Sequence, residues 1–141
     1  MATRGLPSWP WTAAAAQDLP DAESLVLDAM RAWAAPGSPG PLAQASLVLA
    51  AAGAEAASLA LDGLLRRLTG LSPACLLCPS LTQEEGDLLL ALGAAQAGRR
   101  SVALALLHRL APPMAAYRAM PELLGLACAL RRAEVTLAGR L

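Results

Sequence analysis

Four residues of the chain belong to types that bind metals or carry out redox chemistry: Cys75, Cys78, Cys128 and His108. Three thiolates and an imidazole are a ligand set that tetrahedral zinc accepts. A Cys-x-x-Cys pair alone can act in redox chemistry when it follows a strand and opens a helix, because the helix N-terminus lowers the thiol pKa. The spacing of the four fits no zinc module, and no strand pattern precedes Cys75. We therefore expect small apolar side chains in a loop bounded by prolines, with a zinc or redox protein using Cys75 and Cys78 as the alternative.

The remaining chemical groups favour structural roles. General base chemistry at His108 requires an orienting carboxylate and a nucleophile, and the sequence supplies neither nearby. Glu84, Glu85 and Asp87 fall in the first turn of a predicted helix, where acidic residues complement the exposed amides. No phosphate loop, metalloprotease motif or nucleophile elbow occurs. We predict a protein that is not an enzyme and has no cofactor.

Composition favours a single all-helical domain. Of 141 residues, 56% are hydrophobic, and Ala, Leu, Arg, Gly and Pro dominate while Phe, Ile, Lys and Asn are absent. The first three of these residue types have high helix propensity. This amino-acid composition is typical of a protein from a GC-rich, bacterial genome. We expect an irregular arm over residues 1–17, carrying Trp9 and Trp11, and one helical domain over residues 18–141.

Charge and location follow from simple counts. Eleven basic and 11 acidic residues balance, whereas nucleic-acid binders carry a basic surplus. The longest weakly polar run, residues 42–61, contains Glu55, which argues against a membrane span. An odd number of cysteines favours a reducing compartment, and prolines near the N-terminus interrupt any signal helix. We predict a cytoplasmic protein without membrane insertion.

The stretch 81–110 is the clearest structural element and predicts a helical hairpin. Thr82 and Glu85 have capping-box spacing, Gly98 opens a tight turn, and Pro112 and Pro113 end the second helix. Further helices are expected over residues 21–35, 41–52 and 54–68. The last of these is predicted to have an apolar stripe made of Ala57, Leu61, Leu64, Leu65 and Leu68. After a short helical turn over 114–120, one mostly continuous helix is expected from Pro121, with a third hairpin that turns at Arg131 and Arg132 as the alternative.

An internal repeat relates the two halves. Residues from Leu47 align with those from Leu88, about 41 residues later, each as a helix, a glycine-containing turn and a second helix. Repeats of this length are typical of stacked antiparallel helical hairpins. The pattern resembles tetratricopeptide (TPR) hairpins, with small or apolar residues at the positions where paired helices meet: Leu90, Ala91, Ala94, Gly98, Ala103, Leu107 and Leu110.

More narrowly, residues 81–112 resemble the small TPR-like chaperones of bacterial type III secretion. The resemblance implies a groove that holds a small helical secretion subunit. We therefore predict a protein-binding adaptor or chaperone, with a self-assembling, oligomeric helical scaffold as an alternative. Leu88, Leu89 and Leu90 fall on successive faces of a helix and cannot all face one neighbour, so we expect some leucine surface to remain there for a partner. The partner-binding side chains are predicted to be Leu88, Leu89, Leu92, Val102, Leu106, Trp9 and Trp11.

Overall fold

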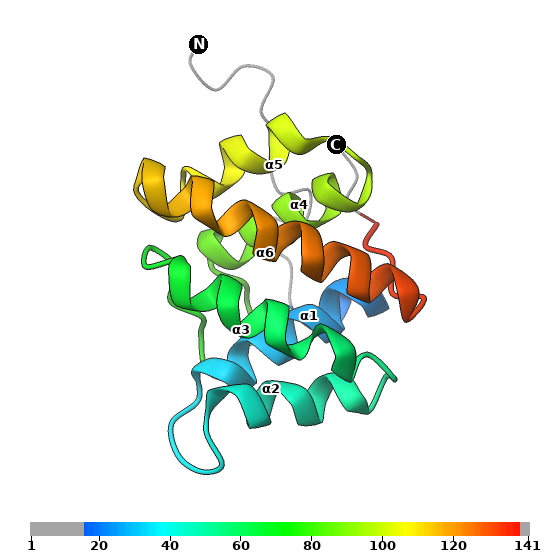
Figure 1. Ribbon diagram of the computed structural model, residues 1–141. Coiled ribbons are helices and arrows are strands. Elements are labelled where there is room, and N and C mark those ends of the chain that lie inside the picture. Colours follow the sequence, from blue (N-terminus) through cyan, green and yellow to red (C-terminus); the bar gives the residue numbers. More distant parts are fainter. Residues whose placement is uncertain (1–15, 139–141) are drawn as a thin grey trace.

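The computed structural model describes residues 16–138, and its regular elements in that range are all helical (Figure 1). The predicted arm therefore lies almost wholly outside the described residues, as do Trp9 and Trp11. A 3-10 turn over Ala16–Asp18 precedes the first helix, and another over Glu55–Ala57 precedes the third. The α-helices are α1 (Asp21–Ala34), α2 (Pro41–Ala50), α3 (Ser58–Arg67), α4 (Gln83–Gln96), α5 (Arg100–Leu107) and α6 (Pro113–Arg132).

Helix α4 is the most deeply buried helix, and α1, α5 and α6 pack against it. Every residue from Glu85 to Ala94 is buried, as expected for a helix that is surrounded on all sides. Its start is the predicted capping box: the Thr82 hydroxyl accepts from the Glu85 amide at 3.1 Å, and the Glu85 carboxylate accepts from the Thr82 amide at 2.9 Å. The cap thus fixes where the core helix begins.

The first three helices begin and end close to the predicted positions. Pro41 opens α2, where its missing amide has no helical acceptor. Gly53 and Gly98 have φ of +72° and +79°, so the two predicted turns use the left-handed conformation that glycine adopts without strain. The apolar stripe predicted for α3 is buried throughout: Ala57, Leu61, Leu64, Leu65 and Leu68.

Helix α6 corrects the predicted start of the final helix. A single helix was expected there, and it is one helix, but it begins at Pro113 and carries Pro121 in its interior. Its buried stripe runs through the proline without interruption, and Pro121 itself is exposed. Packing of that continuous stripe against the core outweighs the loss of one backbone hydrogen bond.

The order of packing differs from a regular stack of consecutive hairpins. Helices α1 and α2 form one antiparallel pair and α4 and α5 another, but α3 packs mainly on α6 (Figure 1). Helix α6 lies between α3 and α4, so the two repeat copies do not stack directly on each other. The all-α class is confirmed, and the TPR-like arrangement stays a prediction. Within residues 16–138, no helix has the length and hydrophobicity needed to cross a bilayer.

Candidate partner-binding site

The leucines predicted to bind a partner form the core instead. Leu88, Leu89, Leu92 and Leu106 are each at most 1% exposed. The prediction that leucine surface remains along this stretch is wrong, because α1, α5 and α6 cover the faces of α4 that carry them. Val102 is half-buried on α5 and packs against the same core. A charged residue at Leu89 or Leu106 would therefore test folding rather than binding.

Exposed apolar side chains lie outside this core, in a groove between α5 and α6. The groove has a volume of about 390 Å³. Tyr117 on its wall is 67% exposed, and Met114, one turn earlier on α6, is 62% exposed. The lining residues are Arg100, Ser101, Leu104, Tyr117, Met120, Pro121 and Leu124.

Helical spacing explains why these residues meet. Arg100 and Leu104 are four residues apart on α5, and Tyr117, Pro121 and Leu124 are three or four apart on α6, so each set shares one face of its helix. Pro121 has no amide hydrogen, and the Tyr117 carbonyl therefore lacks the donor that a residue four positions later normally provides. The lining of the groove is therefore mainly apolar, with Arg100 and Ser101 as its polar exceptions on α5.

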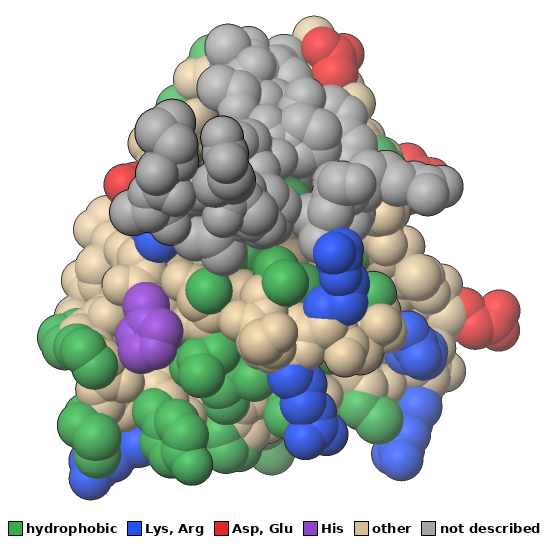
Figure 2. All heavy atoms as spheres, turned by 90° about the horizontal axis from the view of Figure 1, so that it is seen from above, with side chains coloured by type: hydrophobic (Ala, Val, Ile, Leu, Met, Phe, Trp, Pro, Cys, Tyr) green, Lys and Arg blue, Asp and Glu red, His purple; other side chains and the backbone are tan. Residues whose placement is uncertain are grey.

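The surface around the groove is basic. From residue 88 to residue 121 the sequence contains no Asp or Glu. Arg99, Arg100, Arg118 and His108 are all exposed in that stretch. Figure 2, the molecule seen from above Figure 1, shows hydrophobic side chains gathered beside the single histidine, with arginine side chains around them. The balanced net charge of the chain therefore conceals a local positive surplus.

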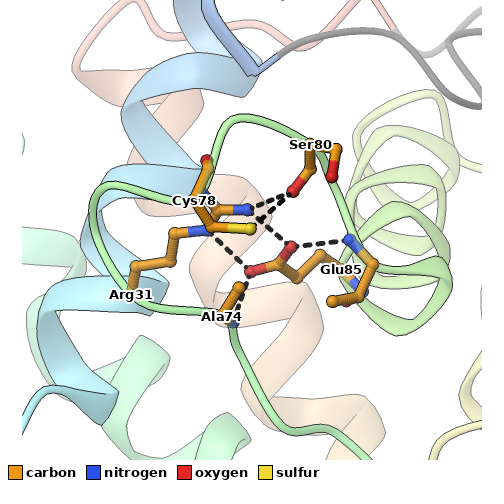
Figure 3. Close-up of polar contacts among 6 residues, drawn as sticks. Arg31, Ala74, Cys78, Ser80 and Glu85 are labelled. Atoms are coloured by element: carbon orange, nitrogen blue, oxygen red, sulfur yellow. Dashed lines mark hydrogen bonds and ion pairs between the residues drawn. The ribbon is translucent and has the colours of Figure 1, made fainter.

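A second feature is the loop that carries Cys75 and Cys78. A buried ion pair anchors this loop to the core. Arg31 on α1 donates to the Glu85 carboxylate at 2.8 and 2.9 Å, and also to the carbonyls of Cys78 at 2.7 Å and Ser80 at 2.9 Å (Figure 3). The Ala74 amide donates to Glu85 at 3.0 Å. Both sides of the loop are thereby tied to the same pair of charges.

The contacts of this pair keep both groups ionised. Burial on its own raises the pKa of Glu85, but the hydrogen bonds from Arg31 and from the amides of Thr82 and Ala74 outweigh it, so its pKa lies below the ordinary value of 4.5. The Glu85 hydrogen bond raises the pKa of Arg31. The network is consequently a fixed structural support rather than a titrating acid–base pair near neutral pH.

The predicted chemical groups do not come together as one metal site, although Cys75 and Cys78 share a turn. Cys75 and Cys128 are exposed free thiols, and Cys78 is partly buried. Within the described part of the chain, no three His, Cys, Asp or Glu side chains gather in a way that could hold a metal ion. His108 ends α5 and is exposed. Asp87 pairs with Arg109 at 3.2 Å, and burial raises its pKa while Arg109 opposes the shift.

Comparison with known proteins finds no matching family, curated protein or solved structure.

The groove residues were not predicted as a site, although the sequence contained signals for it. These signals are the stretch without acidic residues, the single tyrosine at Tyr117, and the position of Pro121 inside an apolar pattern. The packing of α6 against α4 could not be predicted from the sequence, because it depends on contacts between distant residues.

Proposed function

We propose that the protein is a non-catalytic binding module that holds an amphipathic helix of a partner protein in the groove between α5 and α6. The observation that carries the proposal is the groove itself, where Leu104, Met120 and Leu124 line a hollow beside the exposed Tyr117. An amphipathic helix presents apolar side chains every three or four residues, and such a row fits a hydrophobic groove between two helices.

The charge around the groove indicates which kind of partner helix would bind there. Arg100 lines it, the exposed Arg99 and Arg118 adjoin lining residues in the sequence, and no acidic residue occurs between residues 88 and 121. A partner helix with Glu or Asp on its polar face would complement this surface, and a lysine-rich one would be repelled. The proposed partner is therefore an acidic amphipathic helix.

A binding role is favoured over catalysis by the residues of the groove. Its hydroxyl groups, Ser101 and Tyr117, share the lining with one cation and with apolar side chains, and among residues 16–138 no carboxylate, imidazole or thiol lines it. A cytoplasmic TPR-like adaptor, or a type III secretion chaperone for a small helical subunit, is a narrower form of the same proposal. That form is supported only by the leucine and alanine pattern of residues 81–112.

The test uses two designed helical peptides with the same apolar face, one with glutamates and one with lysines on the polar face. Titration calorimetry with the purified protein should show binding of the acidic peptide only, weakening as salt is added. Arg100→Glu and Tyr117→Ala should each weaken binding at least tenfold. Both positions are exposed, so the fold should persist, as circular dichroism would verify.

The matched control is Leu59→Glu, which places a charge on a leucine that is 73% exposed on α3, away from the groove lining. It should leave the affinity unchanged. If neither peptide binds, the proposed function fails. If both peptides bind equally, the groove is a binding site but the acidic partner is wrong.

A further inference from the structure

The loop between α3 and α4 presents two thiols and two leucines at its tip. The Cys78 amide donates to the Cys75 carbonyl at 3.0 Å, which closes a turn around Leu76 and Leu77. Residues at the two ends of such a turn have Cα atoms within about 7 Å of each other. Leu77 is 92% exposed and Leu76 49% exposed, the former more than any other large hydrophobic residue described. This tip is costly to leave bare in water.

The tip has a fixed backbone. Arg31 donates to the carbonyls of Cys78 and Ser80, and the Ala74 amide donates to Glu85, so the residues on either side of the turn are anchored in the protein interior (Figure 3). The turn needs little further ordering of its backbone on binding. The Cys75 thiol is exposed, whereas the Cys78 thiol is partly buried and donates to the Ser80 carbonyl at 3.5 Å, a contact that it would give up on losing its proton to a metal. The Cys-x-x-Cys spacing is the one with which many structural zinc sites take two of their four ligands.

The ligand count requires a second chain. Structural zinc is held by four protein ligands in a tetrahedron, and here one chain offers two. Glu85, the carboxylate next to the loop, is fully engaged by Arg31 and two amides. No third candidate ligand joins the pair within residues 16–138, and residues 1–15 and 139–141 contain no His, Cys, Asp or Glu.

We propose that two copies of this chain share one zinc ion, with Cys75 and Cys78 of each copy as its four thiolate ligands. Each thiol loses its proton to solvent as its Zn–S bond forms, so four protons are released for each zinc bound. The two-fold arrangement gives both copies the same contact. This proposal is independent of the groove between α5 and α6.

The surroundings of the turn suit a contact between two copies. Residues 68–82 contain no charged side chain, so the two loops can approach without like-charge repulsion. Leu76 and Leu77 of both copies would shield the metal from water. A hollow of about 490 Å³ beside the turn, with Pro36 and Pro73 in its walls, offers apolar surface to the leucines of the other copy.

The experiment is a zinc titration of the reduced, metal-free protein, followed by light scattering on a sizing column and metal analysis. We expect a monomer that becomes a dimer with one zinc per two chains and returns to monomer with a chelator. Cobalt(II) in place of zinc should give the absorption of a tetrahedral four-thiolate site. Cys75→Ser and Cys78→Ser should stay monomeric, while Cys128→Ser, which removes the exposed thiol on α6, should dimerise like the parent.

Three results would overturn the proposal. One is a monomer that binds one zinc per chain, because the site would then be complete within a single copy. Another is a dimer that persists in chelator or in Cys75→Ser, because the contact would not depend on the metal. The third is no zinc bound by a protein whose circular dichroism shows that it is folded.

Discussion

The guanidinium of Arg31 on α1 and the carboxylate of Glu85 on α4 meet through two parallel hydrogen bonds, Nε to Oε2 at 2.8 Å and Nη2 to Oε1 at 2.9 Å. Both side chains are at most 2% exposed. Their remaining hydrogen-bonding capacity is used by backbone groups of the loop before α4 and by the capping box. One buried ion pair therefore joins a helix, a loop and a helix start.

We predict that Glu85→Gln lowers the free energy of unfolding by about 3–5 kcal/mol, because Arg31 is left buried without its counter-charge. Urea denaturation followed by circular dichroism would measure the change. The control is Arg66→Ala: Arg66 is 61% exposed and pairs with Asp62 at 3.0 Å, and removing such a surface partner should cost less than about 1 kcal/mol. Equal losses in both variants would show that the buried pair has no special weight.

The same pair predicts how stability depends on pH. The pKa of Glu85 is lower in the folded protein than its ordinary value of 4.5. Its contribution is therefore present above pH 4.5 and is lost as the pH falls through the lower pKa of the folded state. Measured from pH 7 downward, the parent should lose stability below pH 4.5 more steeply than Glu85→Gln. Parallel curves for the two proteins would contradict this prediction.

Asp87 should act in the opposite direction and provides a comparison. Burial raises its pKa above the ordinary 3.8, with Arg109 opposing the shift. The folded state then holds the proton more tightly than the unfolded state, so protonation of Asp87 favours folding as the pH falls. In Asp87→Asn this compensation is absent, and the loss of stability in acid should be steeper than in the parent.

Local signals were sufficient to predict most helices from the sequence. Capping residues, glycine turns and the stripe on α3 act within a few residues, so Thr82, Gly98 and Leu64 could be interpreted correctly. The start of α6 was predicted wrongly because Pro121 was taken as a helix start. Only the packing of residues on both sides of it against the core shows that the helix continues.

The candidate site was harder to predict than the fold. Leu88, Leu89 and Leu90 occupy successive faces of α4, which suggested that one face would remain free. All three are buried, because a helix surrounded by neighbours needs apolar residues on every side. Arg31 had no local signal for its role either, since its partner Glu85 lies 54 residues away. Contacts over such distances depend on the whole topology.

Gly70 should tolerate no side chain, because the backbone passes too close. Its amide donates to the Leu110 carbonyl at 2.7 Å, and a Cβ at this position would lie 2.6 Å from the same oxygen. Gly70→Ala should lower the free energy of unfolding by about 1–3 kcal/mol. Gly125→Ala is the matched control: the nearest atom to its Cβ is 3.9 Å away, and alanine in an exposed helical position should add up to about 1 kcal/mol. Destabilisation by both variants would refute the backbone clash.

Gln96 at the end of α4 should hold the segment after α6 in place. Its side-chain amide donates to the carbonyls of Val135 at 3.0 Å and Ala127 at 3.3 Å, and its carbonyl accepts from the Leu137 amide at 2.8 Å. Gln96→Leu leaves these buried groups without partners, which should cost about 1–3 kcal/mol.

Hydrogen exchange distinguishes this local role from a general loss of stability. In Gln96→Leu the Leu137 amide should exchange much faster. The exchange rates of the amides inside α4 should change only as far as the global free energy of unfolding changes. Gln83→Leu changes an exposed glutamine at the other end of α4 and should alter stability by no more than about 0.5 kcal/mol. Should Leu137 keep its protection in Gln96→Leu, other contacts must hold the segment, since the acceptor of its amide hydrogen has then been removed without effect.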